Sequence, residues 1–140
     1  ALIVVAFTAV DDVGVAINPP IVDGQSQGAI AQGIGQGLME CSVVDPKTGQ
    51  MLSGSYLDYA MPRANDLPSL KPIANNSPSP TNSMGVKGAG EGGTTGAPAA
   101  VINAVLDALS FHGVTDITMP ATPYRIWAAI RDGSVMEAGE

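Results

Sequence analysis

The hydrophobic positions in the first half of the chain predict short strands separated by turns. The opening stretch, ALIVVAFTAVDDVGVAIN, is rich in Val and Ile and is interrupted at Asp12–Gly14, which predicts two strands joined by a turn. Further along, the stretch SVVDPKTGQMLSGSYLDYAMP predicts a hairpin whose turn is DPKTG. Residues 63–83 are rich in Pro, Asn and Ser, so we expect an extended connection there that runs over the surface.

The first predicted helix starts near Pro20 or Asp23 and ends near Glu40. An apolar stripe repeats every four residues along it, at Ile30, Ile34 and Leu38. A second stripe follows the helical period on the roughly opposite side and consists of Gln25, Ala29, Gln32 and Gln36. These glutamines either face water, as most glutamines do, or present their amides to a polar ligand. Each glycine in the helix costs about 1 kcal/mol relative to Ala, so tight packing or a close ligand must compensate.

Two further helices are predicted in the last third of the chain. Residues Pro98–Ser110 are apolar nearly all round, which predicts a buried helix. The stretch TMPATPYRIWAAIRDG predicts a short strand and then a helix that is capped by Thr122, begins at Pro123 and ends at Gly133. The predicted fold class is therefore α+β, with mixed short strands, two buried helices and a C-terminal helix.

Composition and charge exclude several classes of function. The chain has 140 residues, of which 45% are hydrophobic and 14% charged, as expected for one globular domain or part of one. A net charge of -7 excludes a nucleic-acid surface, which needs clustered Lys and Arg. The run ALIVVAF is far shorter than the roughly 20 residues of a membrane span, and it lacks the basic flank of a signal peptide.

The chain has too few thiol and imidazole groups for an ordinary zinc site. Its single histidine, His112, follows an apolar helix and is expected near the end of that helix. Its single cysteine, Cys41, is expected to be a small hydrophobic residue. One cysteine also excludes an internal disulfide, which fits a cytoplasmic location. We predict no metal-ligating side chain.

The stretch GVKGAGEGGTTGAPAA places one acid, Glu91, within the most glycine-rich segment. Glu91 either lies in solvent on a surface loop, or the glycines let the backbone approach a ligand that the carboxylate must reach. Backbone amides where such a loop enters a helix bind anions, and a carboxylate beside them can act as a base. Residues 88–93 also match the dinucleotide-binding pattern GxGxxG. We reject that interpretation, because SPSPTNSMGV precedes them in place of a hydrophobic strand.

Several longer motifs resemble one known family. The stretch GVKGAGEGGTTGAPAAVINAVLDAL resembles the C-terminal segment of the molybdenum hydroxylases, the family of xanthine dehydrogenase, aldehyde oxidase and the carbon monoxide dehydrogenase large subunit. The stretches VAINPPIVDGQSQGAIAQGIGQGLME, GSYLDYAMPRANDLP and MPATPYRIWAAI resemble the same family in the same order. The resemblance runs from about Val5 to about Arg131 and looks closest to the bacterial large subunits.

The resemblance implies roles for individual residues. The acid of the family's KGxGE motif, Glu91 here, is implied to be the active-site base that deprotonates a hydroxyl or water on molybdenum. The glutamine of AQGIG, Gln32 here, is implied to contact the molybdenum centre. The residues implied to contact the pterin are Lys87, Gly88, Ala89 and Gly90. The implied cofactor is molybdenum–molybdopterin in a dinucleotide form, with iron–sulfur clusters and FAD on other domains or subunits.

The resemblance also implies that residues 1–140 are the C-terminal lobe of a molybdopterin-binding domain in a larger subunit. Its implied partners are the rest of that subunit, the iron–sulfur and flavin subunits, and a small substrate. An aldehyde, an N-heterocycle, a purine and carbon monoxide are all compatible substrates, and the isolated fragment is expected to be inactive. The alternative is a non-catalytic ligand-binding or scaffold domain derived from the same fold.

Overall fold

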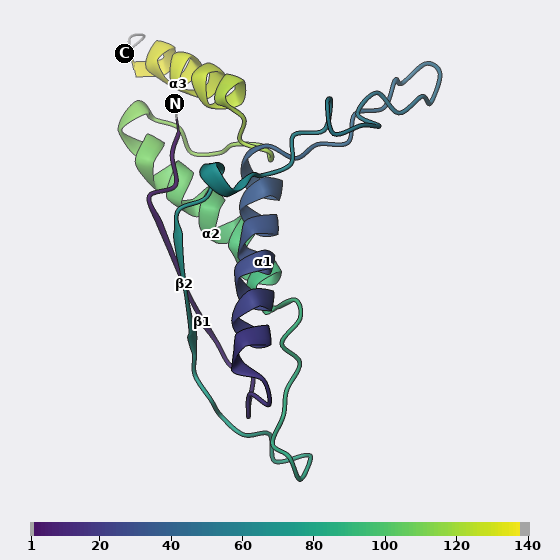
Figure 1. Cartoon of the computed structure of the whole chain (residues 1–140). Coiled ribbons are helices and arrows are strands. Elements are labelled where there is room, and N and C mark those ends of the chain that lie inside the picture. Colours follow the sequence, from purple (N-terminus) through teal and green to yellow (C-terminus); the bar gives the residue numbers. More distant parts are fainter. Residues whose placement is uncertain (1, 138–140) are drawn as a thin grey trace. The chain divides into compact units, whose positions relative to one another are not determined.

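The computed structural model describes residues 2–137, which divide into two compact units. The strand unit comprises Ile3–Gly33 and Arg63–Ala97, and the helix unit comprises Leu2, Ile34–Pro62 and the described residues from Pro98 onward. The regular elements are β1 (Ala6–Asp11), α1 (Pro19–Leu38), β2 (Ser69–Ala74), α2 (Gly92–Leu109) and α3 (Pro123–Glu137) (Figure 1). Short 3-10 helices lie at Ala64–Asp66 and Ser110–His112. The predicted α+β class is confirmed.

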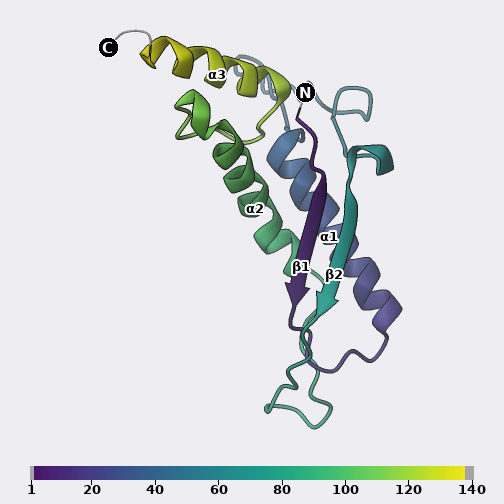
Figure 2. The same ribbon diagram turned by 90° about the vertical axis from the view of Figure 1, so that its left-hand side faces the viewer.

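The strands β1 and β2 form a parallel pair in the strand unit. Their register starts with Ala6 opposite Ser69, and the two arrows run side by side in the same direction in Figure 2. We expected residues 63–83 to be an extended connection over the surface, and the structure shows that Ser69–Ala74 within it form the strand β2. Pro72 lacks an amide N–H, but each strand of a two-stranded sheet leaves one side unpaired, where that missing donor is tolerated.

The second strand predicted after the first turn does not form within residues 12–18. Gly14 instead makes an isolated antiparallel bridge with Val86. Gly14 and Gly85 have φ angles of 64° and 65°, a left-handed backbone that a regular strand cannot contain. The chain therefore bends at this point, and residues 85–87 lie beside the segment that follows β1.

The helix α1 confirms the strongest prediction from the sequence. It begins at Pro19, directly after Asn18, whose side-chain oxygen accepts a hydrogen bond from the amide of Ile21 at 3.4 Å. Ile30 and Ile34 are 0% exposed, so the predicted apolar stripe is the buried face of the helix. The period of four in the sequence thus identified both the helix and its orientation.

The helix α2 begins at Gly92, well before the start that we predicted at Pro98. The main-chain carbonyl of Glu91 accepts the hydrogen bond that closes the first turn, at 3.2 Å. A Cβ on Gly93 would lie 3.0 Å from the Cβ of Ala29, so this glycine lets the first turn pack directly on α1. That packing compensates for the low helix propensity of the glycines, so the helix begins before the predicted start.

One face of α2 is buried, and the rest is not. The residues of the buried face are Val101, Val105 and Leu109. Ala104 and Ala108 are exposed in the described part of the chain. The prediction that this helix is buried all round was therefore wrong for this chain.

The helix unit keeps only the turn of the predicted hairpin. Its strands are reduced to one antiparallel bridge between Val44 and Met51. The turn forms as predicted, because the Asp45 carboxylate accepts hydrogen bonds from the amides of Lys47 at 2.7 Å and Thr48 at 3.3 Å.

The helix α3 starts where the sequence predicted and ends later. The Thr122 hydroxyl accepts a hydrogen bond from the amide of Arg125 at 3.3 Å, which confirms the cap. The helix continues past Gly133 to Glu137, and Gly133 lies where a Cβ would clash with the main-chain carbonyl of His112. The strand predicted just before this helix does not form among the described residues. Within residues 2–137, none of the helices has the length and apolarity that crossing a membrane requires.

Candidate functional site

A polar cleft of about 440 Å³ lies in the strand unit, between the middle of α1 and the start of α2. We call it the glutamine cleft. Its lining residues are Gln25, Gly28, Ala29, Gln32, Gly90, Glu91, Thr94 and Thr95. The cleft therefore brings together Glu91, Gln32 and Gly90, three of the residues that the sequence had singled out.

The α1 side of the glutamine cleft is the second stripe of that helix. Gln25, Ala29 and Gln32 follow one another at helical spacing and so share one face. The opposite face carries Ile30 into the core, which fixes the rotation of the helix. Gln25 and Gln32 are exposed in this chain, but they line a cleft and do not cover a flat surface. Gln36 belongs to the same stripe and is not part of the cleft lining.

The α2 side of the cleft is the start of that helix. Glu91 precedes the first helical residue, and its carbonyl accepts hydrogen bonds from both the amide and the hydroxyl of Thr95, each at 3.2 Å. The Thr94 hydroxyl donates to the carbonyl of Ala29 at 3.2 Å and ties α2 to α1. The first amides of a helix have no partner within it, so they are donors available to a ligand. The Glu91 side chain is exposed and has no hydrogen-bond partner among the described residues.

The remaining candidates lie on the other side of the glycine-rich segment. The Lys87 ammonium is 2.6 Å from a carboxylate oxygen of Asp12. This hydrogen bond from Lys87, with a second from the amide of Gly14, lowers the pKa of the Asp12 carboxyl from its ordinary value. Lys87 and Ala89 line a separate space of about 200 Å³. Gly88 is exposed and lines neither cleft.

We call this second space the valine cleft. Its other lining residues are mainly aliphatic and include Val13, Val15, Ile17, Ile21, Val22 and Val86. The residues predicted to bind one cofactor are thus divided: Gln32 and Gly90 share a cleft with Glu91, whereas Lys87 and Ala89 do not.

No cluster of His, Cys, Asp and Glu suited to hold a metal occurs among residues 2–137. His112 is the last residue of the 3-10 helix that follows α2, close to the predicted place. Cys41 is exposed, so the expectation that it packs as a small hydrophobic residue was wrong for this chain.

The threonines of the site and the partner of Lys87 were not predicted from the sequence. Thr94 and Thr95 were assigned to a loop because the helix start was placed at Pro98. The signal that could have found them is the order of residues, a Gly pair and a Thr pair directly after an acid that could precede a helix. Asp12 was interpreted only as a turn residue.

Comparison with known proteins places these features in a family. The sequence pattern of the molybdopterin cofactor-binding domain matches residues 1–68. The chain is 44% identical over 123 residues to the nicotine 6-hydroxylase large subunit of Paenarthrobacter nicotinovorans, covering 88% of this chain and 15% of that protein. It is 33% identical over 126 residues to the carbon monoxide dehydrogenase large chain of Hydrogenophaga pseudoflava, covering 90% of this chain and 16% of that protein.

Solved structures agree with the sequence matches. The crystal structure of quinoline 2-oxidoreductase from Pseudomonas putida 86 has a TM-score of 0.84 and 43% sequence identity, covering 89% of this chain and 16% of that one. The chain therefore belongs to the molybdenum hydroxylase family, as a segment of a large subunit. It spans only 15% to 16% of the length of these relatives.

The residues of the glutamine cleft fit a molybdenum–pterin group. Two primary amides, two threonine side chains and the first amides of α2 offer donors to phosphate and carbonyl oxygens. Gly28 lines the cleft, and no atom of its surroundings lies within 4 Å of the place that a Cβ would take, so a side chain there would project into free space. Glu91 is the one carboxylate among the residues that line the cleft.

Proposed function

We propose that the chain is part of a molybdenum-dependent oxidoreductase that hydroxylates a small substrate. The reaction replaces a C–H bond with a C–OH bond, takes its oxygen from water, and releases two electrons and two protons. When bound, the molybdenum–pterin group would supply the oxidising centre, and iron–sulfur clusters and FAD elsewhere in the enzyme would accept the electrons. The single observation that carries this proposal is that Glu91 and Gln32 line the same cleft.

Glu91 is proposed as the general base. Glu91 directly precedes the N-terminus of α2. From there its carboxylate can accept a proton from a water or hydroxyl group within hydrogen-bond reach. The main chain of Glu91 is held by Thr95, so the side chain starts from a defined place. Proximity of this kind is what a proton transfer in the transition state requires.

Gln25, Gln32, Thr94 and Thr95 are proposed to hold the cofactor, through donors that surround the same cleft. Gly90 is proposed to let the backbone come close to the cofactor, because it lines the cleft and has no side chain. Contacts of Lys87, Gly88 and Ala89 to the cofactor, and its dinucleotide form, stay predictions.

The names of the relatives suggest which substrates to try first. Two relatives at 43% and 44% identity are named for quinoline and nicotine, both N-heteroaromatic compounds. The carbon monoxide dehydrogenase large chains are 33% identical. We therefore propose an N-heterocycle as substrate. We also propose that the enzyme contains the remainder of the large subunit and separate electron-transfer subunits, since one relative is named a subunit of a dehydrogenase complex.

The test is the substitution Glu91→Gln in the complete enzyme. Turnover of quinoline, nicotine, benzaldehyde, xanthine and carbon monoxide would be measured with a tetrazolium dye as electron acceptor, and molybdenum by mass spectrometry. We expect Glu91→Gln to lower kcat by about 10² to 10⁴-fold with molybdenum retained, because a general base contributes that much. Asp116→Asn, an exposed carboxylate outside the cleft, is the matched control.

Two results would contradict the proposal. Full turnover by Glu91→Gln would remove Glu91 from the reaction. A complete native enzyme without molybdenum would favour the alternative, a non-catalytic ligand-binding or scaffold domain.

A further inference from the structure

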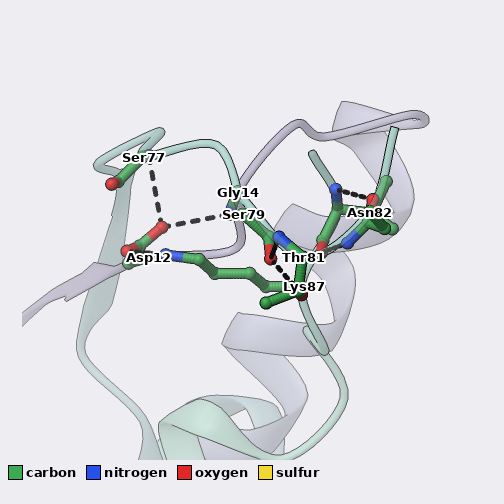
Figure 3. Close-up of polar contacts among 8 residues, drawn as sticks. Asp12, Gly14, Ser77, Ser79, Thr81, Asn82 and Lys87 are labelled. Carbon is green, nitrogen blue, oxygen red and sulfur yellow. Dashed lines mark hydrogen bonds and ion pairs between the residues drawn. The ribbon is translucent and has the colours of Figure 1, made fainter. Parts of the chain in front are cut away.

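Residues 88–91, which include Glu91, have no regular structure, but the residues on either side of them are held to other parts of the strand unit. Asp11 is the last residue of β1, and Asp12 follows it. Asp12 bonds to the start of the glycine-rich segment, whereas Asp11 lies at the start of α2. Figure 3 shows the first of these attachments, with the Lys87 side chain extended towards Asp12.

Asp12 holds three parts of the chain at once. One of its carboxylate oxygens accepts hydrogen bonds from the amides of Gly14 at 3.0 Å and Ser77 at 3.2 Å. The other oxygen accepts from the Lys87 ammonium at 2.6 Å. The Lys87 amide also donates to the Val13 carbonyl at 3.1 Å, so this residue is bound through both its main chain and its side chain.

The other end of the segment is held at the start of α2, where the Thr94 hydroxyl donates to the Ala29 carbonyl at 3.2 Å. Asp11 lies beside this point. Its carboxylate accepts a hydrogen bond at 2.9 Å from the hydroxyl of Ser26, a residue of α1 that is 5% exposed. Its second oxygen is 3.7 Å from the place that a Cβ on Gly92 would take, at the first turn of α2. Residues 88–91 are the part of the chain between these two supports.

The geometry points to the Asp12–Lys87 pair as a positioning element for the Glu91 carboxylate. With Lys87 and α2 both fixed, residues 88–91 must cover a set distance, which limits where Glu91 can lie in the glutamine cleft. The inference rests on the proposed function of Glu91 as a base. It also gives Lys87 a role that needs no contact with the cofactor, since its ammonium is already bound to Asp12.

The pair is suited to act locally. The Asp12 and Lys87 side chains are 39% and 34% exposed, and ion pairs at such a surface contribute little to global stability. Removing the pair is therefore expected to leave the fold intact and to loosen residues 88–91. A base displaced by about 1 Å can lower a rate by about 10²-fold.

The test compares Lys87→Met with Lys87→Arg in the complete enzyme. We expect Lys87→Met to lower kcat by about tenfold or more, with KM and molybdenum content unchanged and faster amide hydrogen exchange in residues 88–91. Lys87→Arg should restore most of kcat, because its guanidinium can still pair with Asp12. Lys71→Met, at an exposed lysine of β2 with no ion pair among the described residues, is the matched control.

A second variant guards against misfolding of the first. Asp12→Asn keeps an oxygen for Gly14 and Ser77 but cannot form the ion pair with Lys87, and it should reproduce the fall in kcat. Unchanged kcat in both variants, while Glu91→Gln is inactive, would overturn the positioning role and leave the proposed function standing. Loss of molybdenum in Lys87→Met would overturn it too, because Lys87 would then be a cofactor contact. Full turnover by Glu91→Gln would instead remove the proposed function on which the inference rests.

Discussion

The two clefts of the strand unit share one glycine-rich segment and differ in chemical character. The glutamine cleft is lined by amides, hydroxyls and the Glu91 carboxylate. The valine cleft is lined mainly by aliphatic side chains, and its one ammonium, that of Lys87, is bound to Asp12. Residues that are neighbours in one sequence motif therefore line two different clefts. A motif such as KGAGE cannot be taken as a single binding site without the fold that separates its residues.

The largest effect should come from adding a side chain where α1 and α2 pack against each other beside the glutamine cleft. Gly93→Val would place a Cβ 3.0 Å from both the Ala29 Cβ and the Ser26 carbonyl. We expect it to destabilise the protein by about 1–3 kcal/mol, as overpacking does, and to lower the content of bound molybdenum. Thermal unfolding would measure the first effect and mass spectrometry the second.

The control for this substitution is Gly96→Val in the same helix. No atom lies within 4 Å of the place that a Cβ on Gly96 would take, so this variant should change stability far less. Equal destabilisation by the two variants would mean that helix propensity, and not the close contact, makes glycine necessary here.

A smaller effect should distinguish the glutamine that lines the cleft from the one that lies outside it. Gln32→Leu removes an amide from the cleft lining, so we expect turnover and molybdenum content to fall on the order of 10-fold. Gln36→Leu, on the same stripe but outside the lining, should have little effect. Identical results for both variants would support the other interpretation of this stripe, in which the glutamines only face water.

The smallest effect is the pH dependence of the Asp12 contact on the valine-cleft side. Its pKa is lowered from 3.8, chiefly by the hydrogen bond from Lys87. The folded state therefore gains stability above pH 3.8 and loses it as the pH falls through the lower folded value. The difference in melting temperature between the wild type and Asp12→Asn should be present at neutral pH and vanish in acid.

Lys87→Met sharpens this measurement, because it removes the largest cause of the shift. In that background the loss of stability should occur closer to pH 3.8. A difference between the wild type and Asp12→Asn that persists unchanged in acid would assign the effect to the shape of the side chain and not to its charge.

The elements that the sequence could predict are those with a clear period. The apolar stripe of α1 repeats every four residues, so both the helix and its buried face were predicted correctly. The strand β2 was missed because SLKPIA contains a proline and lies among Pro and Asn, features typical of loops. Its partner, β1, begins 63 residues earlier in the register, a pairing that no local pattern encodes.

The residues of the site were also predictable only in part from the sequence. Glu91 and Gln32 were selected by a family resemblance, and the structure places both in one cleft. Thr94 and Thr95 were missed because the helix was predicted to start at Pro98, whereas α2 starts at Gly92. The pairing of Asp12 with Lys87 could not be predicted, because it joins residues 75 positions apart and exists only once β1 and the glycine-rich segment have come together.

That separation sets an order of events during synthesis. The contacts that join the end of β1 to Lys87 close a long loop, so they cannot form until the chain has been synthesised as far as Lys87. α1 is complete much earlier and is held by local hydrogen bonds, which form quickly. One wall of the glutamine cleft is thus ready long before the other, and a cofactor that needs both walls can be retained only by a chain whose synthesis has passed the first turn of α2.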